Sequence, residues 1–458
     1  MEYSNLCLRN IYIDYMNVYF LFFLIIIILF FHNYDQIRIW MLNILVINRG
    51  IISLNCFWYN VSESILKDGA GIHLYNDLKK KYGDFPKISM FREDIYLVTN
   101  NEYIKVILDN SPDLFSVGKL KMDFFKSFMA KNVGVSTGCP WKRRRKINET
   151  ALDTDKLHRY SEKYSQDIHN NLTNWRNKSV IEYTDFLKFG KYVVSKIVFN
   201  DDIDDDIFKI FSEANTLECL INPNFQIDHD IYEKYMNILN NHITHPRPKS
   251  LIALCVSASN DNDEILHQIP HFIFPIIGLF VTTLPRLLLL IFNDKNILQN
   301  VIEDIANTVS MSFNIHSLSF LRKCILETLR LNNPVTTTFR TLAQDFAFDE
   351  KHVFQKGTQF LILNNPVLRE KKYFKDPNKF IPERWTQDME QSYYAISFNQ
   401  GPQRCPGKEL AIYLVQCFIY HFFKIKHITM NTIIETNSIN VDDVPQAINP
   451  CNLQFKIH

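Results

Sequence analysis

The sequence predicts a mostly α protein with a minor β portion, built as one large body behind a single amino-terminal membrane helix. The chain has 458 residues, of which 47% are hydrophobic, and this is enough for a substantial core. Residues 150–250 are polar and show the periodicity of amphipathic helices. No internal repeat and no low-complexity linker divides the chain, so one body is favoured over several domains.

The amino-terminal run from Tyr15 to Phe31 reads YMNVYFLFFLIIIILFF and carries no charge. It approaches the roughly 20 residues that a helix needs to cross the hydrocarbon core. A cleaved signal peptide is the alternative, but the apolar run exceeds a signal core and no small-residue cleavage site follows. We therefore expect a membrane anchor in residues 1–35, an interfacial linker in residues 36–61 and a folded catalytic domain in residues 62–458.

The charges beside this run favour one orientation. Arg38 and Arg49 follow it, which favours a single-pass protein whose body is cytoplasmic, although Arg9 precedes it. A second apolar patch, Ile39 to Ile52, contains Arg49 and is better explained as an interfacial segment than as another crossing.

Charge and cysteine content exclude several classes of function. The 50 Lys and Arg residues nearly balance the 49 Asp and Glu residues, so nothing indicates a nucleic-acid partner. The 9 cysteines are scattered without a C-x-x-C pair, which argues against a zinc ribbon or a disulfide framework. Most of them are best interpreted as small buried hydrophobic residues in a reducing compartment.

Two stretches of the body can be assigned from their patterns. Residues 72–110 predict a helix, a turn, two short strands and another helix. Residues 271–293 form a second strongly apolar run, which a hydropathy window could take for a membrane span. Pro275, Pro285 and Arg286 argue against a crossing, because prolines break the helical ladder and a mid-helix arginine is costly in lipid. We expect a long core helix instead.

The most informative stretch is SFNQGPQRCPGKELA, residues 397–411. Two of only 12 glycines, Gly401 and Gly407, flank Cys405. Apolar residues at helical spacing follow, so Cys405 lies just before the amino end of an amphipathic helix. This position favours a thiolate over a thiol.

A thiolate so placed is either a nucleophile or a metal ligand. As a nucleophile Cys405 would need a base, and nothing marks the nearest histidine, His421, as its partner. As a haem ligand it would need glycines that let a porphyrin approach, backbone N–H groups near the sulfur and an aromatic shield such as Phe398.

These residues resemble the signature of the cytochrome P450 family, F-x-x-G-x-R-x-C-x-G. The matching residues are Phe398, Gly401, Cys405 and Gly407, while Gln403 takes the place of the arginine and Arg404 follows it. The resemblance implies that Cys405 is the axial haem ligand and that Phe398, Gly401, Arg404 and Gly407 surround the cofactor.

Two more motifs occur in the family's order. Glu327 and Arg330 match E-x-x-R, whose spacing places both charges on one helix face. Arg384, in FIPERW, stands at the place of the family's third partner. The resemblance implies a buried network of these three side chains that supports the cysteine loop without taking part in the chemistry.

The resemblance also proposes cations for the haem carboxylates. Trp141 and Arg145 match the W-x-x-x-R helix and lie one turn apart on a shared face. Arg340 lies on an expected strand where the family often places another such cation. Taken alone, WKRRRK would more often be a solvated basic face or a targeting patch, and in the family this side also docks an acidic redox partner.

The distal helix departs from the family pattern A-G-x-[DE]-T-[TS], an acid and alcohol pair that delivers protons for oxygen activation. One register places Thr282 on the threonine and Val281 on the acid. The other places Ile277 and Gly278 over the acid and alcohol. The acid is absent from both registers, so Thr282 is either a proton relay or a packing threonine.

The resemblance implies a haem-thiolate monooxygenase, membrane-bound, that takes electrons from a reductase and inserts one oxygen atom into an apolar, lipid-like substrate such as a sterol or a fatty acid. The substrate would contact residues 335–338, the distal helix and residues 447–450. The missing acid leaves open a reductase-independent isomerase, dehydratase or peroxygenase. A non-catalytic haem-binding protein is the second alternative.

Overall fold

The computed structural model describes residues 70–458 except 91–92, 119–120, 123–124, 126–128, 153–158, 211–225, 309–317 and 437–449. The expected anchor and linker in residues 1–61 lie outside the described residues, as do residues 447–449 of the expected substrate turn.

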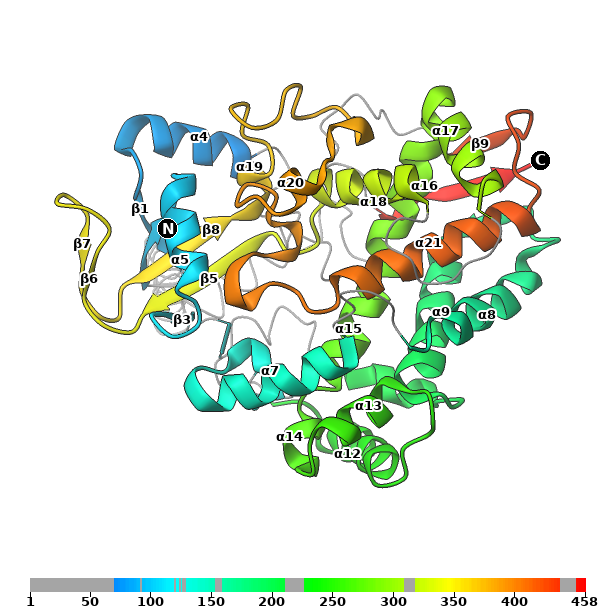
Figure 1. The fold of residues 1–458 in the computed structure, drawn as a ribbon, viewed down its shortest axis with the longest axis horizontal. Coiled ribbons are helices and arrows are strands. Elements are labelled where there is room, and N and C mark those ends of the chain that lie inside the picture. Colours follow the sequence, from blue (N-terminus) through cyan, green and yellow to red (C-terminus); the bar gives the residue numbers. More distant parts are fainter. Residues whose placement is uncertain are drawn as a thin grey trace, which may run out of the picture.

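Helices make up most of the described chain, which confirms the predicted mostly α body with a minor β portion (Figure 1). The α-helices are α4 (Ala70–Tyr82), α5 (Asn101–Asp109), α7 (Gly138–Leu152), α8 (Ser161–Leu172), α9 (Tyr183–Val194), α12 (His229–Thr244), α13 (Leu251–Ala258), α14 (Asn262–Leu266), α15 (Pro270–Gly278), α16 (Leu284–Asn293), α17 (Lys295–Ala306), α18 (Ser319–Leu331), α19 (Asn364–Val367), α20 (Gln387–Glu390) and α21 (Lys408–Ile425). Shorter turns used below are η2 (Val133–Val135), the π-helix η6 (Leu279–Thr283), η9 (Gly401–Gln403) and η11 (Pro450–Asn452).

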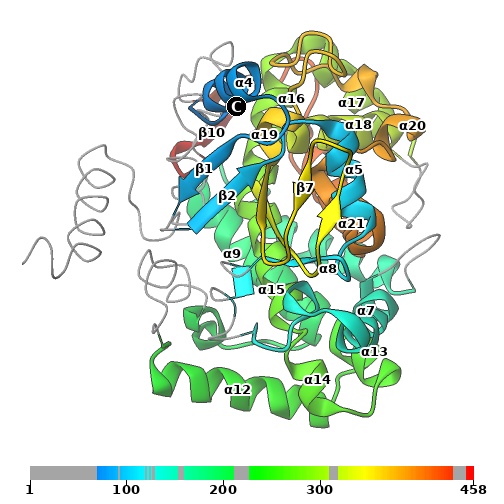
Figure 2. The same cartoon turned by 90° about the vertical axis from the view of Figure 1, so that its left-hand side faces the viewer.

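The β portion is small and lies mainly at one end of the molecule (Figure 2). A five-stranded sheet has the order β1 (Lys87–Met90), β2 (Glu93–Leu97), β8 (Gln359–Leu363), β5 (Thr337–Leu342) and β3 (Phe115–Val117). A three-stranded sheet joins β4 (Val180–Glu182), β10 (Gln454–Ile457) and β9 (Ile434–Thr436), and β6 (Phe346–Ala347) pairs with β7 (Val353–Phe354). The order α4, β1, β2, α5 confirms the pattern predicted for residues 72–110.

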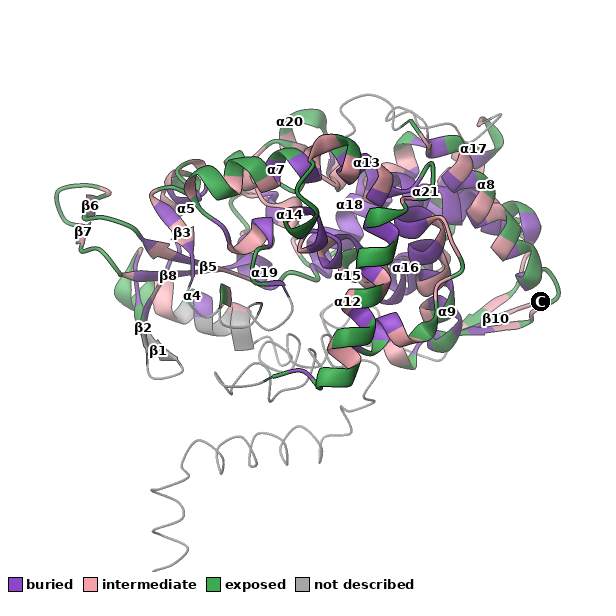
Figure 3. Cartoon of the chain, turned by 90° about the horizontal axis from the view of Figure 1, so that it is seen from below, coloured by how far each residue is buried: buried purple, intermediate pink, exposed green. Residues whose placement is uncertain are grey.

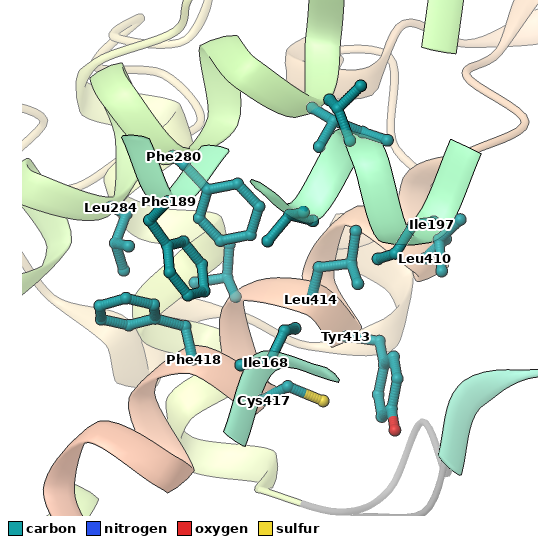
Figure 4. Packing of buried hydrophobic residues seen from close by; sticks show 14 of the residues in the cluster. Ile168, Phe189, Ile197, Phe280, Leu284, Leu410, Tyr413, Leu414, Cys417 and Phe418 are labelled. Carbon is teal, nitrogen blue, oxygen red and sulfur yellow. The ribbon is translucent and has the colours of Figure 1, made fainter. Parts of the chain in front are cut away.

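The main core surrounds α21, which runs beside α8, α9 and the α15–α16 region (Figures 1 and 3). Phe418 on α21 meets Phe189 on α9 with ring centroids 4.9 Å apart, and Phe189 meets Phe280 at 5.1 Å (Figure 4). The helix that follows Cys405 is therefore fixed by aromatic packing along its length.

The long apolar helix predicted for residues 271–293 lies in the core. Across the described residues, Asn262–Asn293 is long and apolar enough to cross a membrane, but 72% of its most apolar window is buried inside the protein. Arg286 lies within it and is 1% exposed. Pro275 and Pro285 flank η6, where the Leu284 N–H donates to the Leu279 carbonyl, five residues back. Prolines lack the amide hydrogen of a regular ladder, which explains the interruption.

Cysteines mostly follow the sequence-based interpretation. Cys255, Cys324 and Cys417 are free and buried, whereas Cys139 and Cys405 are free and exposed. Cys451 is disulfide-bonded, which the scattered cysteine pattern did not predict.

Candidate functional site

The cysteine loop is a fixed turn between the core and α5. The Cys405 N–H donates to the Phe398 carbonyl at 2.8 Å. Gly401 has a φ of +69°, and a Cβ there would lie 2.5 Å from the Leu108 carbonyl oxygen of α5. Gly401 therefore allows a left-handed turn tight against α5. Its expected place beside a porphyrin stays a prediction.

Replacing Gly401 with alanine tests this role. The left-handed backbone alone costs roughly 1–2 kcal/mol with a side chain present. Gly357 is the matched control, because its φ is +88° and a Cβ there would meet nothing within 4 Å. We expect Gly401→Ala to lower the free energy of unfolding by roughly 1–3 kcal/mol more than Gly357→Ala, as measured by denaturant titration. Equal losses would show that the contact with Leu108 is unimportant.

Gly407, unlike Gly401, lies close to the Cys405 sulfur. A Cβ added to Gly407 would lie 4.0 Å from the Cys405 Sγ, which is ordinary van der Waals contact. Gly407 is also the residue before the first turn of α21. Its backbone N–H group lowers the pKa of the Cys405 thiol.

The Cys405 side chain is free and exposed, just before the first turn of α21. Burial among surrounding atoms is nevertheless the largest effect on its pKa and raises it. The Gly407 N–H and the charges of Arg145 and Lys408 act in the opposite direction but are outweighed. The N–H at the start of the helix thus lowers the pKa of the Cys405 thiol, as the sequence predicts, but burial has the larger effect. A bound metal cation would supply the missing stabilisation of the thiolate.

His421 is engaged elsewhere and does not act as a base for Cys405. Its Nε2 lies 2.8 Å from the Ser165 Oγ on α8, and its ring is tilted by 59° against that of His169, with the centroids 5.0 Å apart. Burial lowers its pKa to about 4. The arrangement thus favours the metal-ligand interpretation of Cys405 over the nucleophile.

The cations predicted from sequence converge on the cysteine loop. Arg145 donates from Nη1 to the Arg404 carbonyl at 2.7 Å and from Nε to Glu149 at 2.7 Å. Arg340 donates from Nη2 to the Gln403 Oε1 at 2.8 Å. Arg404 itself has an exposed side chain, so its carbonyl and not its charge meets Arg145. Trp141 is partly buried on α7, one turn before Arg145, and Phe398 packs against the core.

Sequence reasoning missed two further basic residues, Lys121 and His271, that affect this cluster. Burial and the charge of Arg340 lower the pKa of Lys121 to about 8. Burial, followed by the charges of Lys121 and Arg145, lowers the pKa of His271 to about 4. Within the described part of the chain, no carboxylate pairs with Lys121 or Arg340. Neither Lys121 nor His271 stands in a recognisable motif, so the sequence offered no signal for them.

The Glu327 network lies behind this loop. Arg330 donates to Glu327 from Nε and Nη2 at 2.8 and 2.9 Å, and Arg384 donates from Nε at 3.1 Å. Glu327 also accepts from the Trp385 Nε1 at 2.9 Å and the Ile381 N–H at 3.0 Å. Both Glu327 and Arg330 are 0% exposed. The structure thus brings the three predicted partners together, and adds Trp385, which the motif did not include.

The Thr282 hydroxyl of the distal helix is already hydrogen-bonded within that helix. The Thr282 Oγ1 donates to the Gly278 carbonyl at 2.6 Å, one turn earlier. A Cβ on Gly278 would meet nothing within 4 Å, so this face borders open space. Val281 instead packs with Tyr183 in a separate apolar cluster. Since residues 270–293 contain no Asp or Glu, the helix offers no acid beside Thr282.

These features together suit an anionic, metal-bearing cofactor. The exposed Cys405 sulfur provides a metal ligand, and Lys121 and Arg340 lack carboxylate partners in the described residues. Buried cations need a compensating negative charge. A haem, with its iron and two carboxylates, meets both requirements.

Comparison with known proteins agrees with this chemistry. The family model described as Cytochrome P450 matches residues 53–229 and 222–425. The chain is 25% identical over 382 residues to "Probable cytochrome P450 508D1" from Dictyostelium discoideum, covering 72% of this chain and 79% of that protein. It is 29% identical over 145 residues to a beta-amyrin 28-monooxygenase from Solanum lycopersicum, covering 32% of this chain. The matches span only 21% to 30% of the length of the first curated relatives.

Solved structures share the fold. The retinoic acid-bound cyanobacterial CYP120A1 superposes with a TM-score of 0.70 at 18% identity, covering 87% of this chain and 96% of that one. A complex of P450BioI with a hexadec-9Z-enoic acid-ligated acyl carrier protein gives 0.61 at 16% identity, covering 79% and 93%. At these identities the likeness establishes the fold.

Proposed function

Because the chain belongs to the cytochrome P450 family, whose cofactor is a haem held by a cysteine thiolate, we propose that it is a membrane-bound monooxygenase acting on an apolar, lipid-like substrate. The observation that carries the proposal is the free, exposed Cys405 just before α21, in a loop that Arg145 and Arg340 both contact. The bound haem would supply oxygen activation, favoured by electron donation from the thiolate.

The residues of this chain would hold that cofactor in distinct ways. Cys405 would ligate the iron, while Arg145 and Arg340 would balance the haem carboxylates. The Phe398 carbonyl fixes the backbone of Cys405, and the Gly407 N–H stabilises negative charge on its sulfur. The Glu327 network would keep this loop from moving as charge develops at the site.

An apolar substrate is supported by exposed apolar residues in two of the segments expected to contact it. Val335, two residues before the partly buried start of β5, is 55% exposed. Pro275 is exposed on a helix that is otherwise largely buried. Relatives and structural neighbours whose names mention beta-amyrin, 24-hydroxycholesterol and retinoic acid support a sterol-like, terpenoid or fatty substrate.

Electron supply and location complete the proposal. Lys142, Arg143 and Lys146 are exposed on α7. Glu264 pairs with the Arg144 Nε at 2.5 Å and with the Arg143 Nη2 at 3.6 Å. The exposed three would attract an acidic reductase. Residues 15–31 would anchor the protein as a single span, with the body on the cytoplasmic side.

Turnover under two oxidant systems tests the reaction type. The full chain, reconstituted with haem in lipid vesicles, is supplied with a lipid extract and either NADPH with a reductase or hydrogen peroxide, and products are identified by mass spectrometry. Products that carry one added oxygen and require NADPH would support the monooxygenase. A thiolate-bound haem that yields no oxygenated product with NADPH would contradict it.

A reductase-independent reaction, such as peroxygenation, isomerisation or dehydration, is the second candidate. The observation that favours it is the apolar environment of Val281 at the acid position, together with the bond from Thr282 to Gly278. A valine cannot relay protons, so this helix would not supply the usual proton path. Products formed with peroxide or with no oxidant, but not with NADPH, would favour this candidate.

Thr282→Val probes the hydroxyl that the sequence offers as a proton relay. If Thr282 only packs and bonds Gly278, we expect peroxide-driven turnover within roughly threefold of wild type. Loss of a group that transfers a proton costs about 10²- to 10⁴-fold instead. Product formation per haem measures the difference, and a loss of a hundredfold or so would assign proton transfer to Thr282.

A further inference from the structure

We propose that Arg322 is a positioning residue for the candidate iron ligand, because its guanidinium ties α18 to both ends of residues 391–407, the segment between α20 and α21 that contains Cys405. This inference rests on the haem-binding function proposed above. The contacts come from a charged cluster outside the sequence motifs, which we call the Arg322 cluster and which consists of Arg322, Glu390, Lys408 and Glu409.

The Arg322 guanidinium binds two carboxylates at once. Its Nε and Nη2 donate to the two oxygens of Glu390, the last residue of α20, at 3.1 and 2.7 Å. Its Nη1 and Nη2 donate to the two oxygens of Glu409, in the first turn of α21, at 2.6 and 2.9 Å. Two-point contacts fix orientation as well as distance, so Arg322 holds the end of α20 and the start of α21 in a defined relation.

Two further contacts close the segment around Cys405. Lys408, the first residue of α21, donates from Nζ to the Glu390 Oε2 at 2.8 Å. Gln400 donates from Nε2 to the carbonyls of Glu390 and Ser392 at 3.1 and 3.0 Å. Cys405 thus lies along the chain between two residues, Gln400 and Lys408, that are both bonded to Glu390.

The Arg322 cluster is distinct from the Glu327 network, although both use α18. Glu327 accepts from Arg330, Arg384 and Trp385. Arg322 lies near the start of the same helix and donates to α20 and α21. The Glu327 network therefore supports the wall behind the segment, whereas the Arg322 cluster holds the two ends of the segment itself.

The charges of the Arg322 cluster balance only while Arg322 is present. Its four side chains are between 14% and 23% exposed, so salt and water screen them only in part. Burial acts to lower the pKa of Arg322, but Glu409 and Glu390 outweigh it and raise that pKa. Burial acts to raise the pKa of Glu390, but Arg322 and Lys408 outweigh it in the other direction. Without Arg322, two carboxylates would face the single charge of Lys408.

This balance reaches the Cys405 sulfur through the start of α21. Burial raises the pKa of the Cys405 thiol, and the Gly407 N–H and the charges of Arg145 and Lys408 act against it. Gly407 and Lys408 adjoin at the first turn of α21, so both depend on where that turn is held. A shift of the turn would weaken the stabilisation of negative charge on the sulfur, and groups beyond the first contacts of a metal ligand commonly tune it in this way.

A cluster that only stabilises the fold is the alternative to a positioning role. Partly exposed ion pairs often contribute little to the stability of a whole chain. The two roles predict different responses to the loss of Arg322. A stabilising role affects opening of the whole chain, whereas a positioning role affects residues 391–407 and the ligand that they carry.

Hydrogen exchange of the haem-free full chain tests where the effect falls. We expect Arg322→Met to speed exchange of the amides in residues 397–411 about tenfold, while exchange in α8 and α9 changes little. Arg247→Met is the matched control, because Arg247 is exposed and pairs with Asp201 at 3.2 Å, away from α18, α20 and α21. It should leave residues 397–411 as in wild type. An equal increase of exchange in α8 and α9 would make Arg322 a determinant of global stability and overturn the inference.

The ferrous carbonyl spectrum of the haem-loaded full chain gives the second measurement. In denaturant below the unfolding transition, we expect Arg322→Met to lose the band of thiolate ligation about tenfold faster than wild type. Arg322 acts through the carboxylates it binds, so Arg322→Met combined with Glu409→Gln should lose the band no faster than Arg322→Met alone. Arg247→Met should behave as wild type.

The outcomes separate this inference from the proposed function. An unchanged lifetime of the band in Arg322→Met, or additive effects of the Arg322 and Glu409 substitutions, would overturn the inference. Failure of the wild-type chain to bind haem through sulfur would instead overturn the proposed function, and the exchange measured without haem would still decide whether Arg322 fixes residues 391–407.

Discussion

Cys405→Ser abolishes thiolate ligation and, with it, oxygenation of any substrate. The serine oxygen is a poor replacement for a soft thiolate ligand, so the ferrous carbonyl spectrum of the variant should lose the band that thiolate ligation gives. Turnover should fall to background. Absorbance of the reduced, CO-bound protein and product formation per haem are the measurements.

Cys139→Ser is the matched control, since Cys139 is also free and exposed but lies on α7. It should keep both the spectrum and the activity of wild type. Circular dichroism of Cys405→Ser should remain that of the wild-type chain, because the Glu327 network does not include the cysteine. A Cys405→Ser protein with an unchanged carbonyl spectrum would rule out Cys405 as the ligand.

Glu327→Gln produces the largest loss of stability that we expect from one substitution. Glu327 accepts hydrogen bonds from Arg330, Arg384 and Trp385. Removing its charge strands a fully buried guanidinium at Arg330, which costs roughly 3–5 kcal/mol. Denaturant unfolding of the haem-free chain measures this loss without any contribution from the cofactor.

Glu303→Gln provides the comparison, because Glu303 is exposed on α17 and its recorded partner is Gln299 one turn earlier. Its effect should stay within about 0.5 kcal/mol. If Glu327→Gln were equally mild, the network would not be a determinant of stability. If it destabilised the chain but also altered the carbonyl spectrum of the folded fraction, the network would act on the ligand loop as well.

The sequence predicted the parts of the site that lie close together along the chain. Cys405 and α21 followed from a glycine pair and helical periodicity, and Glu327 with Arg330 from an i, i+3 spacing. Such signals are local, so one sequence displays them. The helical class and the order of elements in residues 72–110 were predictable for the same reason.

Contacts between distant segments were not predictable. Lys121 meets the site because β3 pairs with β5, which carries Arg340. The function of Gly401 depends on the Leu108 carbonyl, nearly three hundred residues earlier in the chain. The pKa of Cys405 also required the structure, since burial outweighs the nearby backbone and charges. No residue type in the sequence signals these effects.

The interruption at η6 changes how substitutions along the central helix should be compared. A π-turn accommodates one extra residue, which rotates the following segment by about 100° relative to an unbroken α-helix. The helical repeat that starts at His271 therefore does not continue in register through to Asn293. The two repeats are offset from each other at Leu279–Thr283. In an alanine scan of this helix, the effect of substitution should follow one helical repeat before η6 and another after it. A single repeat fitted to the whole helix would assign the wrong side chains to the substrate.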